Sequence, residues 1–341
     1  MTRPKTDNPQ GQQLTTQRIN EMAFSFRHTG TLIAAIELGL FTMLSENPSQ
    51  PAEIAGKMGV PTENAERLMI ACATLHLLEK RGSKYVNVPD VDRYLVKGKP
   101  AYFGDYLAWQ TRNDYDSWKN IASIIKPPKK RYDEMKHNPQ VARAFTVAGY
   151  NSSISAGHKL AREFDFSQYS LFLDLGGGSG CYSIAAALRY PNLHCTVFDF
   201  PTVTAVAEEY IAEAGLSDRV KTHPGDFFED PLPGGADLVA YITPLQVYEK
   251  DDVQFLINKA FDAVEPGGAI LILDYMLNDD KTGPLDSVFR HLGGLSPTRQ
   301  GRVNTPSQFH QYLSNSGFTD IEVSENFLPG SLGKVIGRKR R

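Results

Sequence analysis

The feature that most constrains the fold is a glycine-dense turn between an apolar segment and an alanine-rich one. The apolar segment is Leu171–Asp174, the turn contains Gly176–Gly180, and the alanine-rich segment runs from Cys181 to Leu188. This order is typical of a buried parallel strand followed by a helix. Glycine permits positive φ and close approach of the backbone to a ligand, and a helix N-terminus leaves N–H groups free. The pattern therefore predicts an open α/β sheet with a ligand site at the carboxyl end of this strand.

Further segments continue the α/β pattern. Thr196–Asp199 is a second strand, and its terminal carboxylate suits the two hydroxyls of a ribose. A third unit ends in Gly225-Asp226-Phe227, where an acid and an aromatic ring suit the amine and the ring of an adenine. Two later apolar segments, residues 236–242 and 269–274, add strands. The series predicts a doubly wound sheet with an adenosine site.

Together these motifs resemble the class I S-adenosylmethionine-dependent methyltransferases. More narrowly they resemble the small-molecule O-methyltransferase family that has an N-terminal dimerisation domain. The motifs that carry this resemblance are Asp174–Gly180, Tyr190-Pro191, Phe198–Pro201 and Gly225–Phe228. The resemblance covers nearly the whole chain and implies a Rossmann-like methyltransferase sheet preceded by a mainly α winged-helix domain. It implies an enzyme that uses S-adenosyl-L-methionine and releases S-adenosyl-L-homocysteine.

The resemblance also assigns cofactor contacts. Asp174, Gly176 and Gly178 are expected to surround the amino-acid part of the cofactor. Asp199 is expected to hold the ribose, and Asp226 and Phe227 to bind the adenine. The cofactor set is completed by Phe200 and Tyr241. A dehydrogenase is excluded because a dinucleotide site needs Gly-x-Gly-x-x-Gly, whereas this turn has three successive glycines, a serine and a glycine.

Length, charge and cysteine content narrow the class of protein. A chain of 341 residues is long enough for two domains. The formal net charge of −3 provides no general attraction to nucleic acid or to a membrane surface. No apolar run approaches the roughly 18 residues of a membrane span. The three cysteines are scattered, without metal-ligand or disulfide spacing. We expect a cytoplasmic protein without a metal, and neither nucleic acid nor membrane as a partner.

The N-terminal part has a winged-helix pattern. A helix from Pro51 to Met58 and a turn through Pro61 lead to a second helix, Glu63–Leu78, for which Thr62 is the predicted cap. Residues 79–88 are predicted to form a two-stranded wing. A ligand-sensing transcription regulator is the rival interpretation, but the second helix begins with acids and has one arginine, which does not suit a DNA groove. The resemblance implies that this domain joins two subunits of a homodimer.

Four parts are predicted along the chain. They are a disordered leader at 1–12, a winged-helix-like dimerisation domain at 13–100, a helical linker with substrate-chamber helices at 101–163, and the cofactor-binding domain at 164–341. In the last part, Thr305 ahead of Pro306 is expected to cap a helix that ends at Ser316. Aromatic and polar residues of the linker helices are candidates to bind a flat, apolar acceptor, such as a specialised metabolite or pigment precursor. They are Trp109, Phe145, Tyr150 and Asn151.

The sequence departs from the family at its catalytic position. Many relatives have Leu-His-Asp-Trp after the fourth strand, and the histidine takes the proton of the acceptor hydroxyl. This chain has Pro244-Leu-Gln-Val-Tyr248, so Gln246 replaces the base, and an amide cannot accept that proton at neutral pH. The family's Gly-x-Glu-Arg-Thr run, whose glutamate orients the histidine, is also absent from residues 295–302. Nearby Asp274, Asp279 and Asp280 are expected in a solvated loop rather than at a metal.

Three interpretations of this paired loss remain open. Methyl transfer can go to a ring carbon, a nitrogen or an already acidic hydroxyl, because alignment of the reactants then provides much of the rate. Another base can act, and His291 and Tyr248 are the candidates. Alternatively the protein uses S-adenosylmethionine for hydroxylation or pericyclic chemistry without methylation. Methyl transfer is the favoured interpretation, with carbon or nitrogen at least as expected as oxygen.

Overall fold

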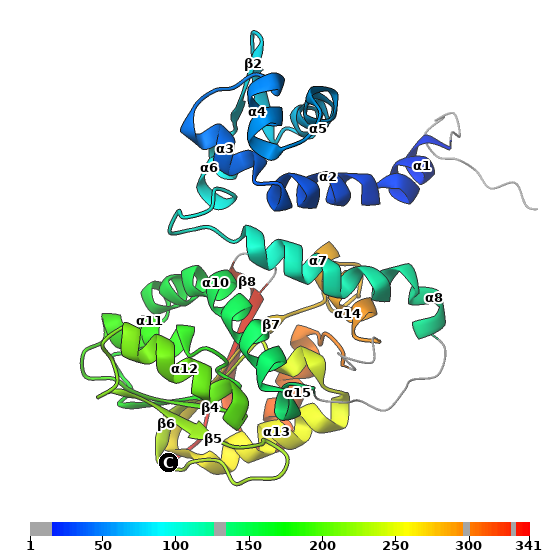
Figure 1. Cartoon of the computed structure of the whole chain (residues 1–341). Helices are drawn as coiled ribbons and strands as arrows, with labels where there is room; N and C mark the ends of the chain where they lie inside the picture. Colours follow the sequence, from blue (N-terminus) through cyan, green and yellow to red (C-terminus); the bar gives the residue numbers. More distant parts are fainter. Residues whose placement is uncertain (1–15, 126–133, 296–300, 329–331) are drawn as a thin grey trace, which may run out of the picture. The chain divides into compact units, whose positions relative to one another are not determined.

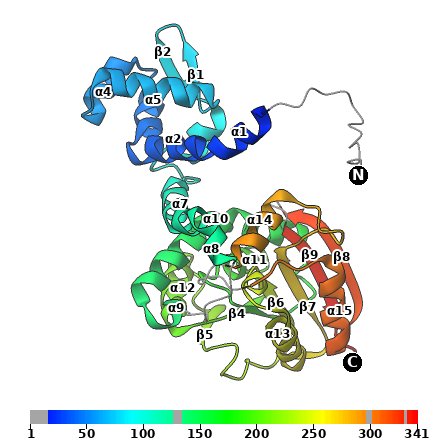
Figure 2. The ribbon, with the colours of Figure 1, turned by 90° about the vertical axis from the view of Figure 1, so that its right-hand side faces the viewer.

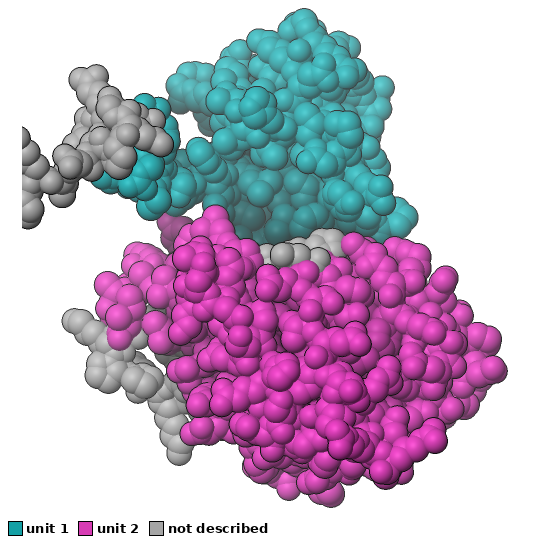
Figure 3. All heavy atoms as spheres, turned by 180° about the vertical axis from the view of Figure 1, so that it is seen from behind, with its two compact units in different colours: residues 1–111 teal, residues 112–341 magenta. Residues whose placement is uncertain are grey.

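The structure is a computed structural model that describes residues 16–125, 134–295, 301–328 and 332–341. The chain divides into two compact units, Met1–Thr111 and Arg112–Arg341, which Figure 3 colours teal and magenta. The leader predicted at 1–12 lies outside the described residues. The four-part division drawn from the sequence stays a prediction.

The first unit is mainly helical and contains one small hairpin. Its elements are α1 (Gln17–Phe24), α2 (Phe26–Glu37), α3 (Leu40–Glu46), α4 (Pro51–Met58), α5 (Thr62–Thr74), β1 (Leu78–Arg81), β2 (Lys84–Asn87) and α6 (Pro89–Tyr94). The strands β1 and β2 pair in antiparallel register and form the predicted wing. Buried side chains from α2, α3, α4 and α5, including Ala35, Phe41, Ile54 and Met69, form the core of this unit.

The second winged-domain helix differs from the prediction at both ends. Pro61 is the N-cap of α5 and Thr62 is its first helical residue, without a side-chain cap bond. The helix ends at Thr74 rather than at Leu78, because His76 takes a positive φ of 58° that a right-handed helix does not allow. Leu78 is instead the first residue of β1.

Among the described residues, no single helix is both long and apolar enough to cross a membrane. One bent pair, Gln17–Glu37 with Leu40–Glu46, meets the criteria of length and composition together. Several side chains of this pair, including Leu40 and Phe41, belong to the core of the first unit.

The second unit contains a seven-stranded sheet in the order β5-β4-β3-β6-β7-β9-β8. The strands are β3 (Leu171–Leu175), β4 (His194–Asp199), β5 (Val220–Pro224), β6 (Ala236–Ile242), β7 (Val264–Tyr275), β8 (Thr319–Leu328) and β9 (Leu332–Arg338). The first five are parallel, and β9 is antiparallel to both β7 and β8. The order reverses at β3, where open α/β sheets bind their ligands. The predicted doubly wound fold is confirmed.

Helices cover both faces of this sheet (Figures 1 and 2). The helices of the unit are α8 (Ile121–Ile124), α9 (Glu134–His137), α10 (Pro139–Glu163), α11 (Cys181–Arg189), α12 (Pro201–Glu213), α13 (Lys250–Ala263), α14 (Leu285–Gly293), α15 (Pro306–Ser316) and the 3-10 turn η1 (Leu245–Val247). The helix α7 (Gly104–Lys119) spans the boundary between the units.

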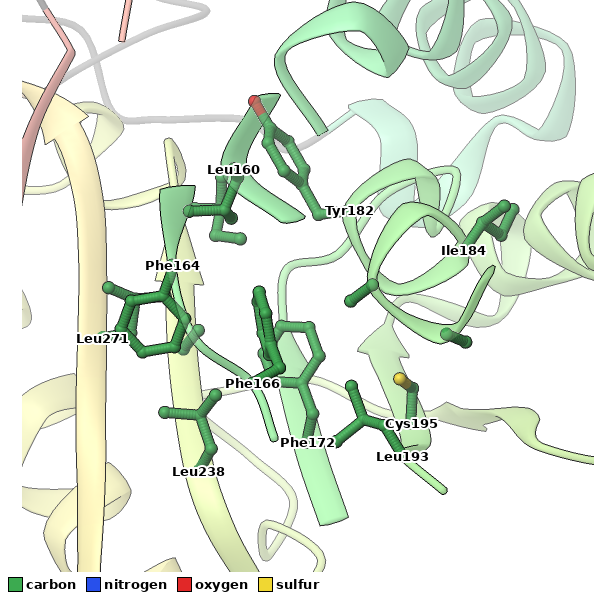
Figure 4. Packing of buried hydrophobic residues seen from close by; sticks show 14 of the residues in the cluster. Leu160, Phe164, Phe166, Phe172, Tyr182, Ile184, Leu193, Cys195, Leu238 and Leu271 are labelled. Atoms are coloured by element: carbon green, nitrogen blue, oxygen red, sulfur yellow. The ribbon is translucent and has the colours of Figure 1, made fainter. Parts of the chain in front are cut away.

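Alternate strand residues contribute to two separate cores, because side chains alternate across a sheet. Phe172 packs with α10, α11 and α12, whereas its neighbour Leu173 packs with α13 and α15. Figure 4 shows part of the first core, to which Leu160 of α10 and Phe172, Cys195 and Leu238 of three adjacent strands contribute. The carboxyl ends of the parallel strands remain at one edge, where the loops carry the predicted site.

Candidate active site

Five polar residues follow or end the parallel strands. Asp174 lies near the end of β3, Asp199 ends β4, Asp226 follows β5, Gln246 follows β6 and Asp274 lies near the end of β7. Because parallel strands end at the same edge of a sheet, the structure brings these residues to one edge. The candidate site is therefore assembled from segments as far apart in sequence as the third and seventh strands.

The glycine turn is packed tightly against its neighbours. The amide of Gly176 donates to the carbonyl of Phe198 at 2.8 Å, which ties the turn to β4. Gly176 and Gly178 have φ values of 67° and 57°, a region that favours glycine. A Cβ atom on Gly177 would lie 2.8 Å from Cγ of Asp174, so no side chain fits there. The turn is thus a backbone surface supported by Asp174 from beneath.

Asp174 is fully buried below this turn. Its Oδ2 accepts a hydrogen bond from Oγ of Ser183 at 2.8 Å. Its Oδ1 has no hydrogen-bond partner among the described residues. Burial raises the pKa of this carboxyl to about 7, with Ser183 acting in the opposite direction. The expected contact of Asp174 with the amino-acid part of a cofactor stays a prediction.

Asp199 is held by two backbone amides. Oδ1 accepts the N–H of Phe200 at 2.8 Å, and Oδ2 accepts the N–H of Gly178 at 2.9 Å. These two bonds fix the orientation of the carboxylate, a group that accepts hydrogen bonds from hydroxyls. The adjacent Phe200 is buried at the start of α12 and packs on Val203. The arrangement suits ribose binding by Asp199.

Asp226 and Phe227 have different surroundings from each other. The Asp226 carboxylate accepts the N–H of Phe228 at 2.8 Å and pairs with Nζ of Lys136 at 2.7 Å. The Phe227 ring is buried, with its centroid 5.6 Å from that of Phe198 and 6.0 Å from that of Tyr241. We expected Phe227 to cover an adenine ring, but its ring is part of the core beneath the glycine turn.

Tyr241 also belongs to the core. It is fully buried, and its hydroxyl donates to the carbonyl of Leu256 at 3.0 Å. The predicted cofactor contact through this side chain is therefore corrected. The reason is its register: the ring of Tyr241 points to the sheet face covered by α13 rather than to the edge.

Gln246 lies in η1, directly after β6. Its Nε2 donates to the carbonyl of Thr243 at 3.1 Å, and no described residue hydrogen-bonds to its Oε1. Thr243 has a φ of 68°, which is an outlier for a β-branched residue. Such strain persists only where the surrounding structure determines it strongly, and it gathers at functional sites. The amide of Gln246 is thus oriented with its oxygen available as an acceptor.

His291, the first candidate replacement base, is poorly arranged for proton transfer. Nδ1 of His291 accepts the N–H of Val303 at 3.2 Å, so the neutral ring carries its hydrogen on Nε2. Burial and the positive charges of Arg302 and Lys281 lower the pKa of this imidazole. A ring in this state donates from Nε2 and does not accept there, which argues against His291 as the base.

Tyr248 is buried in the core of the second unit. Its ring packs edge-on against that of Phe228, with centroids 5.4 Å apart. Its role as a base stays a prediction. The run that replaces the family's glutamate motif is only partly described, because residues 296–300 lie outside the described residues.

Asp274 lies at the same edge of the sheet and was not predicted from the sequence as a candidate site residue. We expected it in a solvated loop, but it is 1% exposed and lies within β7. Oδ1 accepts the N–H of Tyr275 at 2.8 Å, and Oδ2 has no hydrogen-bond partner among the described residues. Burial raises the pKa of this carboxyl to about 7, opposed by its hydrogen bond from the amide of Tyr275 and by the nearby amide of Gln246. The signal was present, since Asp274 ends an apolar run as Asp174 does.

The predicted acceptor-binding residues occupy diverse positions. Tyr150 of α10 stacks on Tyr210 of α12, with centroids 3.9 Å apart, so one of its ring faces serves helix packing. Phe145 and Asn151, also on α10, are exposed. Trp109 lies in α7 within the first unit. The substrate roles of all four residues stay predictions.

Comparison with known proteins identifies the family. Residues 110–319 match the model of the O-methyltransferase domain, and residues 20–97 match the O-methyltransferase dimerisation domain. The chain is 32% identical to 3-hydroxy-5-methyl-1-naphthoate 3-O-methyltransferase of Streptomyces sahachiroi, over 94% of each chain. It is also 32% identical to the tetracenomycin polyketide synthesis 8-O-methyl transferase TcmO of Streptomyces glaucescens, over 95% of this chain and 96% of that protein.

A solved structure agrees with these relatives. Human N-acetylserotonin methyltransferase in complex with SAM superimposes with a TM-score of 0.85 at 27% identity, covering 97% of this chain and 99% of that one. The packed glycine turn and the amide-anchored carboxylate of Asp199 fit such a cofactor. The chain therefore belongs to the O-methyltransferase family, as an S-adenosylmethionine-dependent methyltransferase that carries the family's dimerisation domain.

Proposed function

We propose that this protein transfers a methyl group to an already acidic hydroxyl on a small, planar, polyketide-type aromatic acceptor. From the sequence alone, methylation of carbon or nitrogen was at least as expected as methylation of oxygen. Two relatives that span nearly the whole chain are named as O-methyltransferases, of a hydroxynaphthoate and of a tetracenomycin polyketide. An acidic hydroxyl is the oxygen acceptor that needs no strong enzymatic base, which agrees with glutamine at position 246.

We assign the cofactor to the edge formed by β3, β4 and β5. S-adenosylmethionine supplies an electrophilic methyl group on its sulfonium. The turn presents backbone without side chains, with no atom within 4 Å of the Cβ position of Gly178, and the Asp199 carboxylate, oriented by the Gly178 amide, is a suitable acceptor for ribose hydroxyls. We assign Asp226 as the acceptor of a hydrogen bond from the adenine amine. Titration calorimetry with S-adenosylhomocysteine tests this assignment, and Asp199→Ala should weaken binding by about 1–3 kcal/mol.

The single observation that carries the proposed mechanism is the anchored amide of Gln246. Because Nε2 is bonded to the carbonyl of Thr243, Oε1 is the end that accepts a hydrogen bond from an acceptor hydroxyl. Gln246 then orients the neutral acceptor as it binds and does not take its proton; the contact ends when the hydroxyl ionises, because a phenolate oxygen has no hydrogen to donate. A phenol that ionises near neutral pH loses that proton to solvent, and alignment of the reacting atoms supplies much of the rate.

The test is a panel of hydroxylated naphthalenes and quinones with graded hydroxyl pKa values, together with aromatic amines. We expect kcat/KM to rise with pH through the acceptor's own pKa, so that the inflection moves from one acceptor to the next. Gln246→Ala should lower kcat/KM by roughly tenfold or more, as for loss of one hydrogen bond. Gln168→Ala, which changes an exposed glutamine, is the matched control.

Three results would contradict the proposal. An inflection at one fixed pH for every acceptor would indicate an enzymatic base. A product methylated on carbon or nitrogen, identified by nuclear magnetic resonance, would establish the alternative acceptor atom. Cofactor-dependent conversion of the acceptor without methyl transfer would establish the non-methylating chemistry.

We further propose a homodimer formed through the first unit. The dimerisation-domain match covers residues 20–97 of that unit. Apolar side chains on α1 and α2 are exposed in the single chain, namely Ile19, Met22, Phe24 and Phe26. Arg67, the one arginine of α5, pairs with Glu63 of the same helix, which weakens the case for a DNA-reading helix. A gel-shift assay with random duplex should therefore show no binding.

A further inference from the structure

The short helix α9 connects two loops of the proposed cofactor site. The carbonyl of Met135 accepts a hydrogen bond from Oγ1 of Thr202 at 2.7 Å, at the start of α12. The Met135 side chain packs against the cluster that contains Phe200 and Val203. The next residue, Lys136, reaches the loop after β5. One four-residue helix thus contacts both the start of α12, just after Asp199, and the loop that carries Asp226.

The contact made by Lys136 is a partly buried ion-pair network. Its Nζ lies 2.7 Å from Oδ2 of Asp226 and 2.9 Å from Oε2 of Glu229. The side chain of Asp226 is 12% exposed and that of Lys136 is 27% exposed. By contrast, the pair between Lys159 and Glu163 spans 3.5 Å with both side chains at least 35% exposed. Such exposed pairs contribute little, whereas a pair shielded from water has a stronger effect on its members.

The network controls the charge and orientation of Asp226. Burial alone would raise the pKa of this carboxyl, but Lys136 and the amide of Phe228 hold it below its usual value. One oxygen accepts from Phe228 and the other from Lys136. The backbone N–H of Glu229 also acts on this carboxylate. A carboxylate has about four acceptor positions, so these three donors leave capacity for a further N–H group. The ionised carboxylate is therefore held by the protein's own donors and is still able to accept from a ligand.

We propose that Lys136 is a positioning residue of the cofactor site, which holds Asp226 in the orientation that accepts the 6-amino group of adenine. This inference rests on the cofactor role proposed for Asp226. Lys136 acts on ligand affinity rather than on methyl transfer, because S-adenosylmethionine and S-adenosylhomocysteine carry the same adenine. It should also act on selectivity, because a 6-oxo purine has no amino group to donate.

The experiment is titration calorimetry of the full-length protein with S-adenosylhomocysteine and with its 6-oxo analogue, S-inosylhomocysteine. Lys136→Met should weaken S-adenosylhomocysteine binding about tenfold, the effect of one charge-assisted hydrogen bond. The ratio of the dissociation constants of the 6-oxo and 6-amino ligands should decrease in the same variant. Lys136→Arg should restore most of the affinity. Lys159→Met is the matched control, because it removes an exposed lysine of the same unit.

A double-variant comparison separates positioning from general stability. Asp226→Asn and Lys136→Met should not add, because both act through one carboxylate. Thermal unfolding of the ligand-free variants provides the structural readout. Loss of affinity for both purines in equal measure, or tighter binding by Lys136→Met, would overturn the inference. If Asp199→Ala weakens binding while Lys136→Met does not, the inference fails and the proposed cofactor site stands. If neither variant changes binding, the cofactor assignment itself fails.

Discussion

At the residue scale, two buried carboxyl groups dominate the electrostatics of the sheet edge. Asp174 and Asp274 each lie near the end of an apolar strand and have one oxygen without a hydrogen-bond partner among the described residues. Burial raises the pKa of both groups to about 7. A buried carboxyl favours its neutral form because charge is poorly solvated there. Both groups therefore link the stability of the fold to pH near neutrality.

The pH dependence has a definite sign. The pKa of Asp174 is about 7 in the folded protein against a usual 3.8, so the folded state binds the proton more tightly. The resulting stabilisation is complete below the usual value and is lost as pH rises through 7. We expect the free energy of ligand-free unfolding to fall between about pH 4 and about pH 7, the interval bounded by the unfolded and folded pKa values of this carboxyl. Asp174→Asn should reduce that fall, because an amide does not titrate, as denaturant titration at each pH will measure.

The control for this prediction is Asp165→Asn. Asp165 is an exposed acid whose pKa is lowered by its hydrogen bonds to Ser167, so its effect on stability has the opposite sign. An equal fall in the wild type and in Asp174→Asn would show that Asp174 does not carry a raised pKa.

A second residue-scale prediction concerns Gly177. An added Cβ would lie 2.8 Å from Cγ of Asp174 and 2.9 Å from Cγ1 of Val197. Because the neighbours are buried and have little room to move, Gly177→Ala should destabilise the protein by about 1–3 kcal/mol. Gly234→Ala is the control, since no atom lies within 4 Å of its Cβ position. Equal unfolding midpoints for the two variants would contradict the packing described here.

At the element scale, two helix starts show how local signals succeed and fail. Thr305 was predicted to cap the helix that begins at Pro306, and it does so in a capping box with Gln308. Thr62 was predicted to cap α5, but the cap position is taken by Pro61. The prediction for Thr305 is correct because a capping box depends only on residues three positions apart in the sequence. The difference between the two threonines is directly measurable.

Thr305→Ala should lower the free energy of unfolding by about 1 kcal/mol, because it leaves an amide of α15 without its side-chain partner. Thr62→Ala should change it by no more than a few tenths of a kcal/mol, because no cap bond is lost. Thermal unfolding followed by circular dichroism compares the two. A larger loss in Thr62→Ala would contradict the assignment of Pro61 as the cap.

At the scale of the whole molecule, the proposed dimer explains the exposed apolar side chains of the first unit. Met22 and Phe26 are 67% and 51% exposed in the single chain. If these residues pack against a partner, Met22→Glu should raise the dimer dissociation constant about tenfold or more. Sedimentation over a concentration series measures this constant. Glu21→Gln, on the same helix, is the control, and an unchanged constant in Met22→Glu would place the interface elsewhere.

Much of the site could be predicted from the sequence, and the exceptions have a common cause. Asp199 and the glycine turn were predicted by their positions after apolar strands, and the structure brings them into contact. Phe227 and Asp274 were misjudged because their surroundings depend on residues distant in sequence. Phe227 is buried by Phe198 and Tyr241, and Asp274 is enclosed at the end of β7 beside η1. The position of a residue in the sequence does not show whether distant segments bury its side chain.

The sequence by itself determined the succession of the parallel strands along the chain, the glycine turn and the cap of α15. These features depend on apolar periodicity and on residues a few positions apart, so local physics is sufficient for them. Only the tertiary structure decided that Nδ1 of His291 is occupied by Val303 and that Lys136 holds Asp226, 90 residues away. Burial and ion pairing depend on which distant segments come into contact. The packing of helices on both faces of the sheet determines those contacts.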